Sequence, residues 1–541
     1  MSGKYILGLD RIIVFDGIGL FRKSLRELFI YVRKPCTHYF SLPTLLGLLP
    51  ALTHLHLTTR NTNNWIYAPP QDEEPINDEI QHYSDSNDNN KNENEMYGLV
   101  FLYFECDCVP EFQIKQIIQR CPQLTYLLAP AFYLYDFPVE GPIEFEHIIE
   151  LCPSIRYIHW GEDNSDTTSE IEKRWLALSR RKSGYTDIKN TSDYETRGEN
   201  HLRQVGFGSR DEERHISALA TCLQQPSLLE HLRLYGSYRI GLCSLWNRFT
   251  QHNSNLLSQL LQLKSLHLSG FCVPHQIENS IFFDNFFSHF QHIERLKVGL
   301  LVSHIDNVDK EPNSISKMFE AIGHQLPQLQ CLHIDLSGVG DIDTKIILRD
   351  NLFTTLCDGN QKLEILHLGF VPISNDMLLD LCHHPKLHTL SLSDYERYRR
   401  LTKDGLILFA RELKKQEKRG CGRIQSILLS CCSYAGVRIQ PVLPSSSSDG
   451  SVRIRSIVRV CSPYDSVTDK VLQELAGVKS LKTLQVQYTD NITDAGVNRF
   501  ASIKSSISKK YTKIELYNCK KVSSDNPYVL FVSSPFPRYI Y

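Results

Sequence analysis

The sequence predicts an α/β solenoid, with a curved parallel sheet on the concave face and helices on the convex face. A short phrase, apolar-x-x-apolar-x-apolar, recurs from end to end at intervals of 24 to 47 residues, apart from one gap of 57. A helical pattern precedes most copies, and a proline turn ends many of these helices. One strand-loop-helix-turn unit cannot bury its own apolar stripe, so stacked neighbours must supply the core.

Each phrase has the period of a short strand. The second and third apolar residues are two apart and point to the same face, while the residue between them points to the other face. A degenerate copy near 454–460 would raise the number of repeats from fifteen to sixteen. The fifteen clear copies begin at Leu25, Leu52, Leu99, Leu124, Ile155, Leu202, Leu229, Leu263, Ile293, Leu329, Leu363, Leu387, Ile424, Leu481 and Tyr511.

The segments before the phrases carry the spacing of amphipathic helices. In Phe112–Arg120 and Asp376–Leu381, apolar residues recur at i, i+3 and i+4, which gives one apolar stripe. Proline then stops the helix before the next strand. Turns of this kind contain Pro122, Pro153, Pro226, Pro327 and Pro385.

One repeat shows a more specific resemblance. Leu481-Lys482-Thr483-Leu484-Gln485-Val486 is followed by Asn491-Ile492-Thr493-Asp494-Ala495-Gly496-Val497, where Thr493 and Asp494 suit helix N-caps. Cys-Pro ends helices at 121–122 and 152–153, and Cys519 follows a strand by three residues. The chain thus resembles the cysteine-containing leucine-rich repeats of F-box/leucine-rich-repeat proteins, which are similar to ribonuclease inhibitor in architecture. The resemblance covers about residues 20–520.

The resemblance implies a substrate-recognition receptor of an SCF-type ubiquitin ligase, with a Skp-type adaptor and a cullin as partners. The F-box itself, which docks on that adaptor, is not visible. Twenty-four residues precede the first phrase, too few for three packed helices, and Ser41–Leu46 is interpreted as a repeat helix. Either the module was lost or the chain begins downstream of it.

The domain organisation follows from the phrases. We expect an N-terminal cap at 1–24, the solenoid at 25–521, and a C-terminal cap or tail at 522–541. Polar insertions interrupt the solenoid at 61–96 and 161–198, and a Ser-rich loop lies at 441–450. Between Asp72 and Glu95 there are nine carboxylates and one lysine, so this tract is expected to be disordered. Such insertions either bind a partner or are neutral expansions of a loop.

The candidate binding surface is the concave sheet face. The position between the second and third apolar residues, and the position two residues earlier, should form a near-continuous ribbon, because neighbouring strands lie roughly 4.8 Å apart. From Arg233 to His367 the middle position contains no acid. A basic and aromatic ribbon suits an acidic or phosphorylated protein target, although histidine and tyrosine also simply suit a pleated surface. The candidate residues are His56, Tyr103, Tyr157, His159, His231, Arg233, His267, Arg295, Lys297, His333 and His367.

The composition of the chain limits the partners and cellular compartments that we expect. The net charge is 59 − 61 = −2, with no long basic run except 411–423, so nucleic acid is not expected as a partner. No run of about eighteen apolar residues predicts a membrane span, and the N-terminus is a poor signal peptide. The sixteen cysteines are scattered and include no Cys-x-x-Cys, which predicts reduced core thiols in the cytoplasm or nucleus.

No catalytic motif, metal-ligand set or cofactor motif occurs. Gly-x-Ser-x-Gly, His-Glu-x-x-His and the P-loop are absent, and Gly17-Ile18-Gly19 and similar triplets are expected by chance. A metal site at His333 and His367 would have no evident third ligand. The prediction is therefore a non-enzymatic interaction protein. The alternatives are a stand-alone scaffold or inhibitor without a ligase, and a leucine-rich GTPase-activating protein.

Overall fold

The computed structural model describes residues 3–9, 24–32, 46–59, 96–104, 117–131, 148–149, 151–152, 154–162, 202–209, 211–224, 229–236, 240–273, 281–302, 314–336, 352–369, 371, 373–394, 401–420, 424–431, 466–487, 489, 491–507, 512–517, 519, 521–523 and 525–531. The insertion 61–95, most of the insertion at 161–198, the Ser-rich loop 441–450 and the degenerate repeat at 454–460 lie outside these residues. The chain forms two compact units, with the boundary inside β9 (Ser265–Val273). Unit 1 is Met1–Leu263 with Leu268–Gly270, and unit 2 is Lys264–His267 with Phe271–Tyr541.

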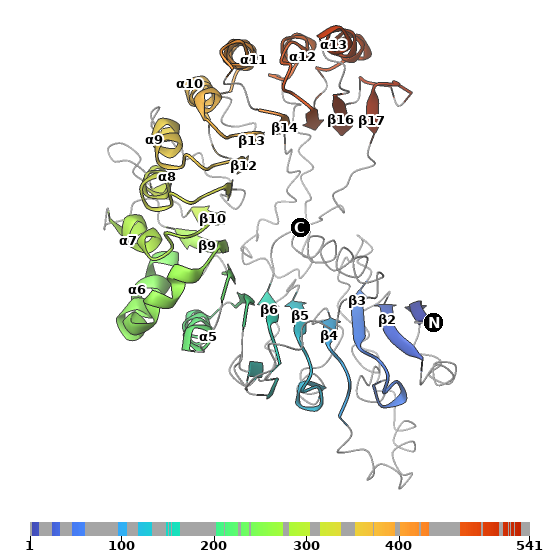
Figure 1. Cartoon of the computed structure of the whole chain (residues 1–541), viewed down its shortest axis with the longest axis vertical. Coiled ribbons are helices and arrows are strands. Elements are labelled where there is room, and N and C mark those ends of the chain that lie inside the picture. Colours follow the sequence, from blue (N-terminus) through green and yellow to red (C-terminus); the bar gives the residue numbers. More distant parts are fainter. Residues whose placement is uncertain are drawn as a thin grey trace, which may run out of the picture. The chain divides into compact units, whose positions relative to one another are not determined.

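Unit 1 is built on consecutive parallel strands, each paired with the next along the chain (Figure 1). Helices α5 and α6 and the 3-10 helix η7 follow the later strands. The elements are β1 (Gly3–Leu9), β2 (Leu25–Val32), β3 (His54–Thr59), β4 (Phe101–Phe104), β5 (Tyr126–Ala131), β6 (Tyr157–Glu162), β7 (Gln204–Gly208), α5 (Glu212–Gln224), β8 (His231–Tyr235), α6 (Leu242–Asn253) and η7 (Ser254–Gln262).

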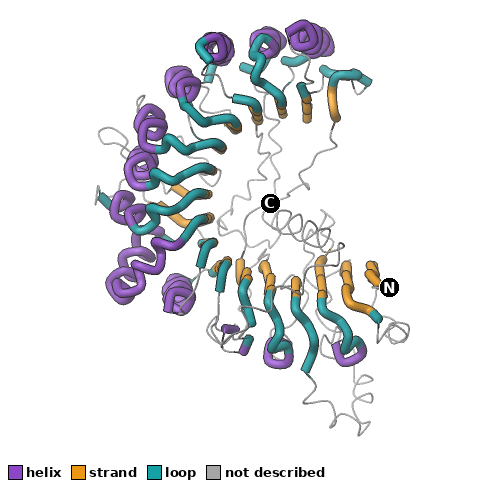
Figure 2. The backbone as a smooth tube through the Cα atoms, viewed as in Figure 1, coloured by secondary structure: helices purple, strands orange, loops and turns teal. Residues whose placement is uncertain are grey.

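Unit 2 alternates strand and helix in its described part as far as β16, and its helices lie on one side of its strands (Figure 2). Strands β10 to β17 again pair in parallel, each with the next. The elements are α7 (Phe282–Ser288), β10 (Arg295–Val302), α8 (Ser314–Gln325), β11 (Cys331–Asp335), α9 (Leu352–Gly359), β12 (Ile365–Gly369), α10 (Asn375–Asp380), η8 (Leu381–His383), β13 (Thr389–Asp394), α11 (Lys403–Lys418), β14 (Ser426–Cys431), α12 (Asp469–Ala476), β15 (Thr483–Gln487), α13 (Asp494–Ile507), β16 (Lys513–Tyr517) and β17 (Val529–Phe531).

The solenoid prediction is confirmed: each of the fifteen clear phrases gives one strand, β2 to β16 in order. The fold is a leucine-rich-repeat solenoid of the α/β class. Two strands lie beyond the phrases. β1, inside the segment expected to be a cap, pairs with β2, and β17, inside the expected C-terminal tail, pairs with β16. β6 continues to Glu162, so the second insertion begins after the predicted residue 161.

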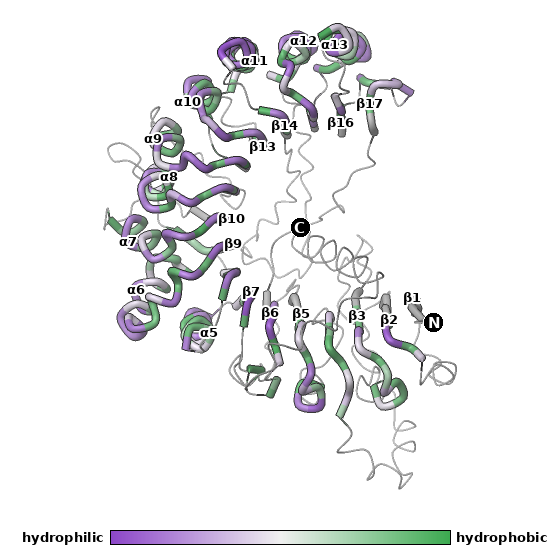
Figure 3. Tube along the Cα trace, viewed as in Figure 1, coloured by the Kyte–Doolittle hydropathy of each residue, from purple (hydrophilic) through white to green (hydrophobic). Residues whose placement is uncertain are grey.

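The core lies between the strands and the helices. The phrase leucines are almost completely buried, as Leu55, Leu332 and Leu366 at 0 % exposure illustrate. The helices contribute their apolar stripes, and Figure 3 shows hydrophobic and hydrophilic positions mixed along α8, α11 and α13, as amphipathic helices require. Burial of one stripe from each repeat supplies the hydrophobic free energy that a single repeat lacks.

The turn before the strand repeats in detail in several repeats. In these repeats the residue three positions before the phrase is buried, and its carbonyl accepts a hydrogen bond from the first phrase residue. Leu124 N donates to Cys121 O at 3.0 Å, and Leu363 N donates to Asn360 O at 2.9 Å. Where the residue at this position has a polar side chain, it bonds to carbonyls nearby: Cys152 Sγ donates to Ile118 O at 3.5 Å, and Asn360 Nδ2 donates to Leu356 O at 3.0 Å.

The second phrase residue aligns the repeats. Its carbonyl accepts two hydrogen bonds from the next repeat, which keeps equivalent positions of neighbouring strands side by side. Thr53 O accepts from Val100 N at 2.9 Å and from Phe101 N at 3.0 Å. Gln330 O accepts from Glu364 N at 2.8 Å and from Ile365 N at 3.0 Å. The inner columns described below depend on this alignment.

The helix-cap prediction is confirmed for Thr493 and wrong for Asp494. Gly496 N donates to Thr493 Oγ1 at 3.4 Å, as an N-cap requires. Asp494 is the first residue of α13, and its carboxylate instead accepts from Asn526 Nδ2 at 2.8 Å and from Ser523 N at 3.1 Å. Asp494 therefore ties α13 to the next turn of the chain.

The described cysteines are free thiols, as the sequence predicts. Cys121, Cys152, Cys222, Cys357, Cys382 and Cys519 are buried. Burial raises the pKa of the Cys152 thiol to about 12, so it stays protonated and unreactive at neutral pH. Among the described residues, no helix has both the length and the hydropathy needed to cross a membrane.

Candidate partner-binding face

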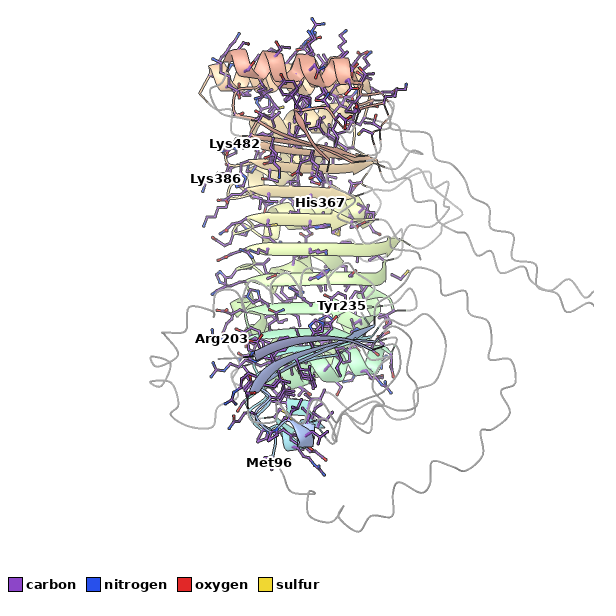
Figure 4. All side chains as sticks on the ribbon, turned by 90° about the vertical axis from the view of Figure 1, so that its right-hand side faces the viewer. Met96, Arg203, Tyr235, His367, Lys386 and Lys482 are labelled. Carbon is purple, nitrogen blue, oxygen red and sulfur yellow. The ribbon has the colours of Figure 1, made fainter. Side chains whose placement is uncertain are left out.

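Strand alternation places all eleven predicted residues on the inner face, defined here as the sheet face opposite the described helices. Two columns run along it. The first column holds the third residue of each phrase, including Tyr157, His231 and Arg295. The second column holds the fifth residue, including His56, Tyr103, His159, Arg233, His267, Lys297, His333 and His367. The register is unbroken from Lys297 through His333 and His367 to Ser391. Figure 4 labels His367 on β12.

The expectation that the second column is an accessible ribbon is wrong for four residues. His56, Tyr103, His159 and His267 are at most 5 % exposed. Their neighbours explain the burial in unit 1. The rings of His56 and Tyr103 have centroids 4.2 Å apart, and Tyr103 also joins a hydrophobic cluster with Phe101 and Leu128. These side chains therefore stabilise the sheet and are not available to a partner.

A glycine makes room for His159. A Cβ at Gly206 on β7 would lie 2.4 Å from His159 Nδ1, closer than any side chain could approach. The imidazole instead lies over the glycine and meets Tyr235 edge-on, with ring centroids 5.3 Å apart. Gly206 thus explains why this part of the second column is closed.

Three of the six predicted histidines, His159, His333 and His367, do not carry a positive charge at neutral pH. Burial, together with the positive charge of Arg233, lowers the pKa of His159 to about 3. Burial and Lys297 lower the pKa of His367 to about 4, and burial, His367 and Lys297 hold the pKa of His333 well below its usual value. All three are neutral at pH 7, and the predicted set keeps Arg233, Arg295 and Lys297 as basic residues.

His333 and His367 lie in contact, with ring centroids 3.9 Å apart. No group of three or more His, Cys, Asp or Glu residues that could hold a metal ion occurs in the described part of the chain. We assign no metal or cofactor role to this pair.

The first column of unit 1 carries a row of aromatic rings. Ring centroids are 5.8 Å apart between His54 and Phe101, 5.9 Å between Phe101 and Tyr126, and 4.5 Å between Tyr126 and Tyr157. The last two rings are parallel to within 4°. His54, Tyr126 and Tyr157 are half-buried, so the row still presents an accessible edge. We call these four residues the aromatic row.

Two arginines beside this row were not in the predicted set. Arg156 and Arg203 occupy the second phrase position, directly before β6 and β7, and both are exposed. Burial and the neighbouring Tyr157 raise the pKa of Tyr126, and the positive charges of Arg156 and Arg203 partly lower it. In the sequence, these two arginines could have been found as basic residues that directly precede an aromatic or polar residue at the start of a strand.

The fold and this face define a class: a leucine-rich-repeat solenoid whose strand side carries an aromatic row and two exposed arginines beside it. No protein-family model matches the chain, and no curated protein matches it.

Among solved structures the chain is similar to a chain in the crystal structure of the Rad7 and Elc1 complex in yeast. The sequence identity is 14 %, the match covers 80 % of this chain and 79 % of that chain, and the TM-score is 0.41. It is also similar to TLR13 in a complex with ssRNA13, at 10 % identity and a TM-score of 0.32, covering 93 % of this chain and 43 % of that one. We draw no functional argument from either likeness.

Proposed function

We propose that this chain is a protein-interaction module that binds a protein partner through its inner face. The aromatic row carries the proposal. Half-buried rings held at fixed spacing on neighbouring strands lose little conformational entropy on binding, and aromatic and arginine side chains are the residue types that anchor protein interfaces.

The finer proposal is a substrate-recognition receptor of an SCF-type ubiquitin ligase, in the cytoplasm or nucleus. It is supported by the resemblance of the repeat at 481–497 to F-box/leucine-rich-repeat proteins, including the Thr493 N-cap of α13. The target would be held on the inner face, while a Skp-type adaptor and a cullin would supply ubiquitin transfer. The alternative is a scaffold or inhibitor with the same face and no ligase.

The test is affinity purification of the full chain from its native cells. Wild type is compared with Tyr157→Ala/His231→Ala, two half-buried positions of the first column, and with Leu408→Ser, a control on the exposed side of α11. We expect the double variant to lose most of the recovered partner, with Leu408→Ser unchanged and with thermal unfolding of both variants close to wild type. Equal recovery by all three proteins would exclude the inner face as the binding surface.

The same purification separates the two finer alternatives. Stoichiometric recovery of a Skp-type adaptor and a cullin with all three proteins would support the ligase receptor. Partners recovered without either component would support the scaffold or inhibitor.

A further inference from the structure

We propose that Tyr126, Tyr157, Arg156 and Arg203 in unit 1 form a subsite for a phosphoryl group carried by the protein partner. The inference rests on the proposed function and specifies the chemistry that this part of the inner face recognises. It adds Arg156 and Arg203, which lie outside the two columns, to the binding surface.

The backbone holds the four residues together. Arg156 N donates to Thr125 O at 3.0 Å, and Arg203 N donates to Arg156 O at 2.9 Å, so the two arginines are backbone neighbours on adjacent strands. One residue further along β5 and β6, Tyr126 pairs with Tyr157 in the register, and their rings are stacked at 4.5 Å. Figure 4 shows Arg203 at the edge of the sheet where the strands begin.

Neither arginine of the cluster forms an ion pair within the described part of the chain. Other arginines there pair with acids: Arg248 with Glu212, and Arg411 with Glu474. Arg156 and Arg203 are exposed, and among the described residues no carboxylate pairs with either of them. Glu230 holds the same phrase position in the next repeat, where its N donates to Arg203 O at 2.9 Å, but no ion pair joins its carboxylate to Arg203. Two neighbouring guanidinium groups that lack a paired acid favour an anion between them.

The tyrosines add hydrogen-bond donors. Burial is the main cause of the raised pKa of Tyr126, and the neighbouring Tyr157 raises it further. The Tyr126 hydroxyl therefore stays protonated at neutral pH. A protonated tyrosine hydroxyl can donate its proton to an oxygen of a bound partner.

The number and geometry of the donors favour a phosphoryl group over a carboxylate. Two guanidinium forks and a hydroxyl offer more N–H and O–H donors than the two oxygens of a carboxylate can accept, while a phosphoryl group presents three oxygens and up to two charges. Nucleic acid is less suited, because single-stranded bases need free aromatic faces. Here Tyr126 and Tyr157 cover each other's faces, and Phe101 lies next to Tyr126.

The experiment measures binding of degenerate peptide libraries to the full chain by fluorescence anisotropy. Each library carries one central phosphoserine, phosphothreonine or phosphotyrosine, and matched libraries carry the unmodified residue or glutamate. The variants are Arg156→Gln/Arg203→Gln and Tyr126→Phe/Tyr157→Phe. The control Lys386→Gln/Lys482→Gln removes the same amount of charge from exposed positions in unit 2.

We expect at least one phosphorylated library to bind at least tenfold more tightly than both matched libraries. The arginine double variant should lose at least tenfold in affinity, the tyrosine double variant should lose several-fold, and the lysine control should stay within twofold of wild type. Arg156 and Arg203 are exposed, so their substitution should leave thermal unfolding unchanged.

The phosphoryl subsite would be overturned if the glutamate libraries bound as tightly as the phosphorylated libraries. It would also be overturned if the arginine double variant bound the phosphorylated libraries as tightly as wild type. A third contrary result is that no phosphopeptide binds, while a uridine 12-mer binds and its binding depends on Arg156 and Arg203. Phosphatase treatment of the lysate separates this inference from the proposed function. If a partner is still recovered after treatment and still depends on Tyr157 and His231, the interaction module stands and the phosphoryl subsite fails.

Discussion

His159 shows how one side chain on the inner face can determine pH behaviour. The His159 ring is buried against Tyr235 and over Gly206. The positive charge of Arg233, two strands away, makes protonation of this ring still less favourable. The imidazole is therefore neutral in the folded chain, while the unfolded chain takes up a proton near pH 6.5. Because the pKa of His159 is lower in the folded chain than in the unfolded chain, the folded state keeps its full stability above pH 6.5. This contribution to the free energy of unfolding is lost as the pH falls from 6.5 toward 3.

We predict that the free energy of unfolding falls by about 2 kcal/mol between pH 7 and pH 5 on account of His159 alone. In His159→Gln this part of the pH dependence should disappear, although the variant is less stable at pH 7. Urea unfolding at several pH values measures the difference, with Gln361→Ala as a control that changes no titratable group. A pH slope identical to wild type would show that His159 is protonated in the folded chain.

At the scale of elements, helices α8 and α9 approach each other through glycine. A Cβ at Gly359 would lie 1.8 Å from Gly323 O, and a Cβ at Gly323 would lie 2.9 Å from Thr355 O. Asn360, the next residue, bonds to Leu356 O at 3.0 Å and to Ile322 O at 3.4 Å. The helix spacing in this part of unit 2 therefore depends on a missing side chain and on one buried amide.

We predict that Gly359→Ala destabilises unit 2 by about 3 kcal/mol, since α8 and α9 must separate or distort to admit the methyl group. Gly420→Ala is the matched control. Its Cβ would meet nothing within 4 Å, and the strain at φ +78° should cost about 1 kcal/mol. The free energies come from urea unfolding. Equal losses in the two variants would mean that the helix contact is not tight.

At the scale of the whole molecule, stability is expected to be local. The described strands pair with their neighbours in the sequence, and the chain divides into two compact units. In such an array the free energy is close to a sum of repeat and nearest-neighbour contributions.

Gly359→Ala should therefore raise amide exchange mainly in α8 to α10 and β11 to β13, and hardly at all in β4 to β7. Hydrogen-exchange mass spectrometry of the full chain, compared with wild type, gives the measurement. A uniform increase across both units would show that the chain unfolds as one cooperative body, contrary to this expectation.

The amino-acid sequence by itself determined the repeat. Fifteen phrases predict fifteen strands because the alternation of Leu52, Leu55 and Leu57 and its equivalents is a local pattern that each repeat carries in full. The inner columns follow from the same alternation. The phrases do not reveal β1 or β17, because those strands lack the pattern and are recognised through pairing with β2 and β16.

The tertiary structure determined which residues of the inner face are accessible to a partner. His56 and His159 occupy the same column position as Lys297, yet both are buried, because Tyr103, Tyr235 and Gly206 come from other repeats. The neutral state of His159 and the adjacency of Arg156 and Arg203, 47 residues apart in the chain, likewise depend on the register between strands. A periodic pattern specifies a face, but the accessibility and charge of that face depend on contacts between residues far apart in the sequence.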